Sequence, residues 1–442
     1  MPQYTAPMKR TLFAIILIVT ASLSVLSMQS DGARIDAAFQ KFWSAQSPEE
    51  AARLADDIAK SGVTFDGALA KLKAGRAYAD QPGGIVRMMN KTRDGIEHYF
   101  SVNIPENYTA AKRYQVRFQL HGGVDGRTDN QPRGNGSIGQ LAGAEQIYVL
   151  PYAWRDAGWW SDDQVLNLRT IVDQLKRTYN VDENRVVVAG VSDGATGAYY
   201  IAMRETTLFA SFLPLNGFIL VLANPDIDDN GNYPNNLLNK PLFVVNGGRD
   251  RLYPTSAVEP YTQLLMRNKV RIDYHPQPEG EHNTAWWPEV KGSFEEFVAS
   301  HPRDPYPDVL TWTAANTEHN RAHWLVIDEL GTRPNEPTRI ADVNQLTNRN
   351  VLFDKQKPSG RVDLVRMGNT VEATTKGVAT FTLLLSPDEF DFSQPVKVSV
   401  NGRSAFDGRV ERNLKTLLKW AAEDNDRTML FGAELKIKVP NR

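Results

Sequence analysis

Residues 185–203 read RVVVAGVSDGATGAYYIAM, an apolar run that passes through a glycine-flanked serine into a second apolar run. The first run, RVVVA, is typical of a strand buried on both faces of a sheet, and we expect the second to be helical. Gly190-Val191-Ser192-Asp193-Gly194 lies between them. A Gly-x-Ser-x-Gly turn between a strand and a helix is the nucleophile elbow, in which a sharp turn makes the serine hydroxyl project from the sheet. The alternative is an ordinary glycine-rich turn without chemistry.

Ser192 needs two partners before it can act. A serine hydroxyl is a poor nucleophile unless a base takes its proton, and the base needs an acid to orient it. In this topology the acid and then the histidine follow the serine along the chain. Asp250 follows the apolar strand Leu242–Asn246, and His282 lies in the loop after the next strand, Val270–His275. We therefore expect Ser192, Asp250 and His282 to form a catalytic triad.

Both partners have competitors in the sequence. His275 is the alternative to His282, but it stands at the end of a strand, where a structural hydrogen bond is the more common role. For Asp250 the alternative role is that of a turn-forming aspartate. Asp226 and Asp228 are further candidates for the acid.

A triad also needs two backbone N–H groups that stabilise the oxyanion. One belongs to Asp193, the residue after the nucleophile, and the other to an earlier strand-to-helix loop. The strand Gln115–Leu120 runs into His121-Gly122-Gly123-Val124. Bare glycine backbone can approach a substrate closely, so we assign the second donor to Gly123, with Gly122 as the close alternative. We expect His121 to order this loop rather than to transfer protons.

Apolar runs on both sides of the elbow predict the rest of a sheet. Strands that alternate with helices at this spacing imply right-handed crossovers and a mostly parallel sheet. We therefore expect an α/β fold with a doubly wound sheet over residues 81–302. The expected elements are an antiparallel pair, Ile85–Met89 with His98–Ile104, strands at Gln115–Leu120, Ile147–Pro151, Arg185–Ala189, Phe212–Leu215, Leu242–Asn246 and Val270–His275, and helices near Val165–Leu175 and Val290–Ser300.

The segments that flank this core differ from it. Residues 31–80 have a helical pattern, and Ser47-Pro48-Glu49-Glu50 is a helix start with Ser as N-cap and Pro in the first turn. The proline-rich segment His301–Asp308 predicts a domain boundary. Residues 309–442 predict a mostly β accessory domain, which we expect to be a sandwich, with turns at Asn401-Gly402 and Asp407-Gly408 and one helix near Leu414–Ala422.

The first thirty residues predict export. Lys9 and Arg10 precede an apolar run over residues 11–26, and small and polar residues follow it. This is the pattern of a secretory signal peptide, and the run is short for a membrane span, which takes about 20 residues. We expect a periplasmic or extracellular protein with no stable membrane insertion after signal removal. An uncleaved N-terminal anchor is the alternative.

Composition excludes several classes of protein. The 442 residues include 50 Lys and Arg against 52 Asp and Glu. The chain therefore lacks the excess of basic residues that a dedicated nucleic-acid-binding protein needs. Hydrophobic residues make up 41%, enough for buried cores. The chain contains no Cys, which excludes disulfides, thiolate metal sites and a cysteine nucleophile. The chemistry must therefore use oxygen and nitrogen side chains.

Four motifs, LHGG, GVSDG, GGRD and EGEHN, follow one another in this order. They resemble the α/β-hydrolase superfamily, and more narrowly its secreted esterase branch, which includes polyhydroxybutyrate depolymerases, feruloyl esterases and related carboxylesterases. The likeness covers about residues 81–301. It implies Ser192, Asp250 and His282 as the triad and hydrolysis through an acyl-enzyme without a cofactor. The chain departs from the secreted depolymerases, which often carry Cys near the oxyanion loop.

Residues around the site suggest how a substrate is held. Trp286 and Trp287 follow His282, and Trp159 and Trp160 precede a helix. They are candidates for an aromatic wall against an aryl or sugar group, and packing between helix and sheet is the alternative. Between Ser192 and Asp250 only about residues 218–240 remain for an insertion, too few for a large lid. We therefore expect an open cleft that suits bulky or polymeric esters.

The loop over residues 226–231, DIDDNG, matches the first half of a Ca²⁺ loop. Leu237 stands where the loop needs a Glu at its twelfth position, so we expect a solvated turn and no metal. The leading hypothesis is an exported serine hydrolase that cleaves carboxylic esters of a small or polymeric substrate, with no cofactor and an oligomeric state that the sequence leaves open. The alternatives are a peptidase of the prolyl-oligopeptidase type and a non-catalytic binding protein on a hydrolase fold.

Overall fold

The computed structural model describes residues 32–92, 95–332, 353 and 357–440. The expected signal peptide, residues 1–30, lies outside the described residues. In the described part of the chain, no helix combines the length and the apolar content needed to cross a bilayer.

An eight-stranded sheet with the order β1-β2-β4-β3-β5-β6-β7-β8 forms the centre of the molecule. β2 is antiparallel to β1 and β4, and the remaining neighbours are parallel. This is the mostly parallel sheet that the sequence predicts, and the chain has the α/β-hydrolase fold. The strands are β1 (Gly84–Lys91), β2 (Glu97–Ile104), β3 (Tyr114–Leu120), β4 (Ile147–Pro151), β5 (Val181–Val191), β6 (Ser211–Leu215), β7 (Leu242–Gly247) and β8 (Ile272–Gln277).

Helices cover both faces of this sheet, because its strands are apolar on both sides. In β5, Val186 and Val188 pack in the cluster that includes side chains of α4 (Asp162–Thr178), α5 (Asp193–Arg204) and α6 (Thr255–Arg267). Val187 and Ala189 point to the other face and pack with α7 (Trp287–Ser300). The sequence did not predict α6, because Pro260 lies inside it and a proline within a helical pattern indicates a break.

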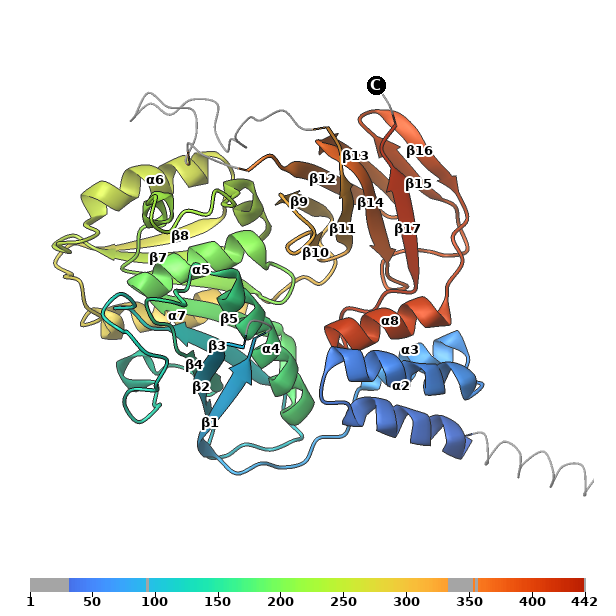
Figure 1. The fold of residues 1–442 in the computed structure, drawn as a ribbon, viewed down its shortest axis with the longest axis horizontal. Helices are drawn as coiled ribbons and strands as arrows, with labels where there is room; N and C mark the ends of the chain where they lie inside the picture. Colours follow the sequence, from blue (N-terminus) through green and yellow to red (C-terminus); the bar gives the residue numbers. More distant parts are fainter. Residues whose placement is uncertain (1–31, 93–94, 333–352, 354–356, 441–442) are drawn as a thin grey trace, which may run out of the picture.

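Helices also precede the sheet: one over residues 32–44, then α2 (Pro48–Lys60) and α3 (Phe65–Ala74). Ser47 caps α2, as predicted, by accepting a hydrogen bond from a backbone N–H of the first turn. The apolar faces of these helices are buried against α8 (Leu414–Asp424). Figure 1 shows the N-terminal helices in blue directly beside α8 in red, so segments from the two ends of the chain pack together.

The C-terminal region is mostly β, as the sequence predicts, and consists of two sheets around one apolar core. The orders are β10-β11-β14-β17 and β16-β15-β13-β12-β9, and all pairs are antiparallel except β13 with β15. The strands are β9 (Val309–Ala314), β10 (Arg321–Ala322), β11 (Leu325–Leu330), β12 (Gly360–Met367), β13 (Thr370–Lys376), β14 (Val378–Leu385), β15 (Val396–Val400), β16 (Arg403–Gly408) and β17 (Ala433–Lys438).

One of the two predicted turns in this region is wrong. Asn401-Gly402 does join β15 to β16, with both residues at positive φ. Asp407-Gly408 instead ends β16, where Gly408 pairs with Val396 of β15. Although Asp-Gly favours turns, both residues form backbone pairs with β15, because β15 begins at Val396 and so extends alongside them.

Two asparagines fix the β sandwich to the α/β core. Residues 218–240 form two short 3₁₀ helices, η2 (Ile219–Ala223) and η3 (Pro234–Asn239). Asn236 and the backbone of Thr313 exchange two hydrogen bonds, of 3.0 and 2.8 Å. Asn239 does the same with Thr311, at 2.7 and 3.1 Å. Because β9 is an edge strand, these side chains occupy backbone groups that another strand would otherwise pair with.

The proline-rich segment is anchored on both sides. Arg303 is 3% exposed. Its guanidinium donates to Asn184 Oδ1 and Thr207 O in the α/β core, and to Asp426 Oδ2 (2.7 Å) and Thr428 Oγ1 near the C-terminal end. A buried arginine with partners on both sides makes this segment part of the packed interior.

Candidate active site

The nucleophile elbow lies between β5 and α5. Ser192 has φ 57° and ψ −116°, a strained backbone conformation for a residue with a side chain. The glycines at its flanks permit this turn, because a Cβ at Gly190 would overlap the carbonyl oxygen of Gly194. The local sequence therefore folds as the motif predicts, and the serine hydroxyl is presented at the carboxyl edge of the sheet.

The structure brings Ser192, His282 and Asp250 together. His282 Nε2 lies 2.8 Å from Ser192 Oγ, and His282 Nδ1 lies 2.7 Å from Asp250 Oδ2. A carboxylate only accepts hydrogen bonds, so Nδ1 donates to Asp250, and Nε2 of the neutral ring accepts from the Ser192 hydroxyl. The three residues follow β5, β7 and β8, which are parallel and deliver them to one edge of the sheet.

Asp250 fills both roles that the sequence left open. Its side chain is buried, and its second oxygen, Oδ1, accepts hydrogen bonds from the backbone N–H groups of Leu252 (2.8 Å) and Tyr253 (3.0 Å). The aspartate thus closes a local turn with one oxygen and orients His282 with the other. The turn fixes the carboxylate, which in turn fixes the imidazole.

The competing residues have other contacts. The ring of His275 stacks on Phe243 at 4.3 Å between centroids. Asp228 accepts hydrogen bonds from Asn230 N–H and Asn232 within its own turn. Asp226 lies in the same loop, with its N–H bound to the side chain of Asn224.

The glycine loop after β3 lies against the elbow. A Cβ at Gly122 would lie 2.9 Å from Ser192 Cβ, and Gly123 has φ 68°. The N–H of Val124 donates to Asp193 Oδ2 at 2.7 Å, which links this loop to the first residue of α5. The two predicted oxyanion donors, Gly123 and Asp193, therefore belong to segments that a hydrogen bond holds together.

His121 also orders the glycine loop, through hydrogen bonds at both of its ring nitrogens. Its Nδ1 donates to Gly122 O (2.9 Å), and its Nε2 accepts from the N–H of Ala153 (3.1 Å). Burial lowers the pKa of His121 to about 4, so the ring is neutral at pH 7. The indole N–H of Trp159 donates to the carbonyl of His121 at 2.8 Å. This environment matches the ordering role expected for His121.

Three of the four tryptophans that were candidates for an aromatic wall are buried. Trp159, Trp286 and Trp287 are buried, and Trp160, which is partly exposed, packs against the apolar core. Trp287 donates to the carbonyl of Ala142 (3.3 Å), on the side of the sheet covered by α7. The packing alternative therefore holds for the three buried rings, because large apolar rings stabilise most when they are removed from water.

Two residues beside the triad were not predicted. Tyr253 places its ring edge-on to His282, with 5.6 Å between centroids. Asn216 is buried at φ 51°, and its amide donates to the carbonyl of Asn283, next to His282, at 2.6 Å. The signal for Asn216 was present, since asparagine directly after an apolar strand is among the few residues that tolerate a left-handed backbone.

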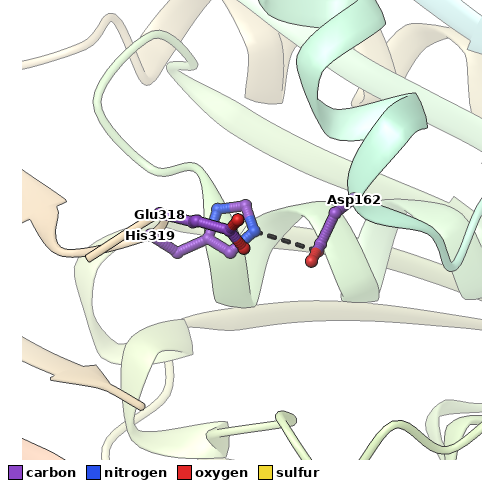
Figure 2. A group of neighbouring side chains, drawn as sticks. All are labelled: Asp162, Glu318 and His319. Carbon is purple, nitrogen blue, oxygen red and sulfur yellow. Dashed lines mark hydrogen bonds and ion pairs between the residues drawn. The ribbon is translucent and has the colours of Figure 1, made fainter. Parts of the chain in front are cut away.

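Asp162, Glu318 and His319 are the group of described residues whose spacing would suit a metal ion (Figure 2). His319 Nε2 donates to Asp162 Oδ1 at 2.9 Å, and the same oxygen accepts from Arg204 (3.1 Å) and Tyr200 (3.2 Å). Burial opposes ionisation of Asp162, but the His319 hydrogen bond and the Arg204 charge outweigh it and lower its pKa to about 2. These three donors share one oxygen of the carboxylate, and together they form an ion-pair network that joins the sandwich to α4.

Asp228 and Asp229, in the loop over residues 226–231, also accept hydrogen bonds from protein groups. Both oxygens of Asp229 accept from Arg204 Nη2 at 2.7 Å. Asp228 Oδ1 accepts from the N–H of Asn230, which is an Asx turn. The contacts fit the polar turn that we expect from the sequence.

No family model matches this chain, and no curated protein does. Solved structures similar to it include a thermostable esterase (20% identity, TM-score 0.41), which covers 50% of this chain and 63% of its own. S-formylglutathione hydrolase FrmB from Staphylococcus aureus has 16% identity and a TM-score of 0.38, and the match covers 50% of this chain and 99% of that one. Pyrococcus horikoshii acylaminoacyl peptidase has 14% identity and a TM-score of 0.37, and the match covers 51% of this chain and 43% of the peptidase. This chain thus spans under two thirds of the length of the esterase and the peptidase.

Proposed function

We propose that this protein is a serine hydrolase that cleaves carboxylic esters. The observation that supports this is the continuous hydrogen-bonded chain from Ser192 Oγ through His282 to Asp250, at 2.8 and 2.7 Å. Nucleophile, base and orienting acid are each within hydrogen-bond reach of the next, which is the arrangement that activates a serine.

The proposed reaction has two halves. Ser192 Oγ attacks the ester carbonyl carbon while His282 Nε2 takes the hydroxyl proton, and the N–H groups of Gly123 and Asp193 stabilise the oxyanion. Collapse expels the alcohol, which receives the proton from His282, and leaves an acyl group on Ser192. Water, deprotonated by His282, then attacks this acyl-enzyme; the bond to Ser192 Oγ breaks, His282 returns the proton to Oγ, and the carboxylic acid is released. Asp250 keeps the imidazole oriented and stabilises its positive charge throughout.

We also propose a bulky or polymeric ester as the substrate. Residues 218–240, the only long connection between the elbow and Asp250, pack through Asn236 and Asn239 against β9. This segment therefore forms part of the interface with the sandwich. Leu252, two residues after Asp250, is 62% exposed and offers apolar surface beside the triad. An exposed apolar side chain next to Asp250 suits an acyl chain that extends beyond the site.

The test is a hydrolysis panel of short and long acyl esters of 4-nitrophenol, feruloyl and acetyl-sugar esters, polyester film and peptide amides. We expect ester turnover and labelling by a fluorophosphonate probe, and Ser192→Ala should lower kcat by at least about 10⁴-fold and abolish labelling. Ser393→Ala, which changes an exposed serine in the sandwich, is the matched control. Labelling that survives in Ser192→Ala would refute the assignment, and amide turnover above ester turnover would move the proposal to a peptidase.

Export is a separate proposal that rests on residues 1–30 alone. N-terminal sequencing of the protein recovered from cells would test it. A mature chain that begins between about residues 27 and 34 supports a cleaved signal peptide. An intact Met1 in the membrane fraction supports the anchor instead.

A further inference from the structure

A cavity of about 460 Å³ lies at the amino edge of the central sheet. Ala210, Lys240 and Arg271, which line it, stand just before β6, β7 and β8. Ser192, Asp250 and His282 follow β5, β7 and β8, at the opposite edge, so the cavity is distinct from the candidate active site. Its remaining walls are the segment after α7 and parts of the sandwich. Its volume lies within the range of small-molecule sites.

Lys240 is the unusual residue in this cavity. It is 4% exposed, and its Nζ makes no hydrogen bond or ion pair with any of the described residues. Lys176 shows the ordinary solution for a lysine that is buried to the same degree. Its Nζ donates to Asp424 O at 3.0 Å and lies 3.6 Å from Asp426 Oδ2. A charged amine at the end of a buried side chain is costly when it has no partner, so the cavity offers a site for the partner that Lys240 lacks.

The other charged groups around Lys240 make the cavity basic. Arg271 lines it from the start of β8, and Arg303 from the segment after α7. Arg303 is also hydrogen-bonded to Asn184, Thr207, Asp426 and Thr428, so it contributes charge more than free donors. Asp304 is the acidic residue among those that line the cavity, and its side chain is exposed and accepts from Tyr306 N–H.

The histidines that line the cavity already donate to the backbone. His301, at the end of α7, contacts Phe297 O through Nδ1 (2.8 Å), and His323, between β10 and β11, contacts Pro305 O through Nδ1 (3.1 Å). Burial lowers the pKa of His323 well below its usual range, so this ring is neutral. The groups left to bind an anion are therefore the Lys240 amine and the Arg271 guanidinium, whose Nη2 also donates to Asn239 O (3.3 Å), with Arg303 behind them.

We propose that this cavity binds a small organic oxyanion, a carboxylate or a phosphate monoester, with its anionic group on Lys240 and Arg271 and its apolar body against Leu238, Pro241 and Val309. The proposal does not depend on the hydrolase reaction, because it uses other residues at the other edge of the sheet. It names a second ligand site in the molecule.

The charge state of Lys240 gives the site a measurable signature. Burial lowers the pKa of Lys240 well below its usual range, and Arg303 and Arg271 act in the same direction, while Asp304 and Glu205 oppose them. A bound anion favours the protonated amine and raises that pKa. Binding therefore takes up a proton, and affinity falls as pH rises through the pKa of the empty site.

Isothermal titration calorimetry tests this with sulfate and benzoate, both of which stay fully ionised near neutral pH. Titrations in two buffers of different ionisation enthalpy measure the protons taken up. We expect saturable binding of at least one anion, with uptake of up to about one proton. Tighter binding of sulfate would identify the phosphate class, and tighter binding of benzoate the carboxylate class.

The variants are Lys240→Met and Arg271→Gln, with Lys397→Met, an exposed lysine in the sandwich, as the control. Lys240→Met should weaken binding by about 10- to 100-fold, the value of a charge-assisted hydrogen bond, and abolish proton uptake. Arg271 is exposed, so Arg271→Gln should fold normally and weaken binding several-fold even if Lys240→Met does not fold. Binding of neither anion at millimolar concentration, or binding that both variants leave unchanged, would overturn the proposal.

Discussion

Asp193→Ala should slow the proposed reaction without unfolding the protein. Asp193 is the first residue of α5, and its Oδ2 accepts the N–H of Val124 at 2.7 Å. That N–H belongs to the residue after Gly123, whose own N–H is the second proposed oxyanion donor. Removing the carboxylate therefore releases the loop that positions this donor, while the triad keeps both of its hydrogen bonds.

The size of the effect follows from the bond that is lost. A hydrogen bond to a charged acceptor contributes about 1.5–3 kcal/mol, and each 1.36 kcal/mol is a factor of ten in rate. Complete removal of one oxyanion donor costs about 10²–10³-fold in kcat, which sets the upper limit for a donor that is only loosened. We expect Asp193→Ala to lower kcat about 10- to 100-fold and to change KM by less than about threefold, because the donor acts in the transition state.

The assay is steady-state hydrolysis of a 4-nitrophenyl ester together with thermal unfolding of each variant. Asp193→Asn keeps an acceptor but loses the charge, so its kcat should fall between the values for wild type and Asp193→Ala. Glu289→Ala removes a carboxylate from the first turn of α7 and controls for the loss of charge at a helix start. A kcat for Asp193→Ala within about twofold of wild type, in a folded protein, would refute the positioning role.

Three further predictions concern stability. Asp426→Asn should lower the free energy of unfolding by about 3–5 kcal/mol in urea, because buried Arg303 and Lys176 lose their carboxylate; a loss below about 1 kcal/mol would contradict this. Asn236→Ala should cost about 1–3 kcal/mol, since the buried backbone groups of Thr313 lose two partners, and an unchanged urea midpoint would argue against that clamp. The pKa of His121 is 6.5 in the unfolded chain and about 4 in the folded protein, so the unfolded chain binds the proton more readily. The contribution of His121 to the free energy of unfolding is therefore fully present above pH 6.5. It falls by about 3 kcal/mol as the pH drops towards 4. His121→Asn should remove that part of the pH dependence, and equal acid sensitivity in the variant would show that other groups cause it.

The sheet and the approach of Ser192, Asp250 and His282 to one another could be predicted because their signals are local. Apolar strands such as β5 bury both faces, and Gly190 is required by its close approach to the carbonyl of Gly194 within the turn itself. Parallel topology then brings Ser192, Asp250 and His282, which follow β5, β7 and β8, to one edge of the sheet. These features depend on neighbouring residues and on a simple rule for connecting strands.

Other features depend on contacts between distant segments, which a single sequence does not reveal. Asn236 contacts Thr313, 77 residues away, so residues 218–240 could be identified as a short insertion but not as the attachment of the sandwich. Pro260 gives the local signal for a helix break, yet α6 continues because it packs on the sheet. Trp286 and Trp287 carry equal promise as binding or packing residues until the side of the sheet they cover is known.

The contact between the N-terminal helices and α8 also bears on how the chain is made. Ile58 of α2 and Leu418 of α8 are buried in the same cluster. A ribosome that adds about 5–20 residues per second needs roughly 20–70 s to make the roughly 360 residues between them. During that time the apolar face of α2 lacks the part of its cluster that α8 supplies, and any chain that stops before α8 leaves that part uncovered. Completion of synthesis is thus a condition for burying the first helices, and unfinished or truncated chains display an apolar surface that chaperones and proteases can recognise.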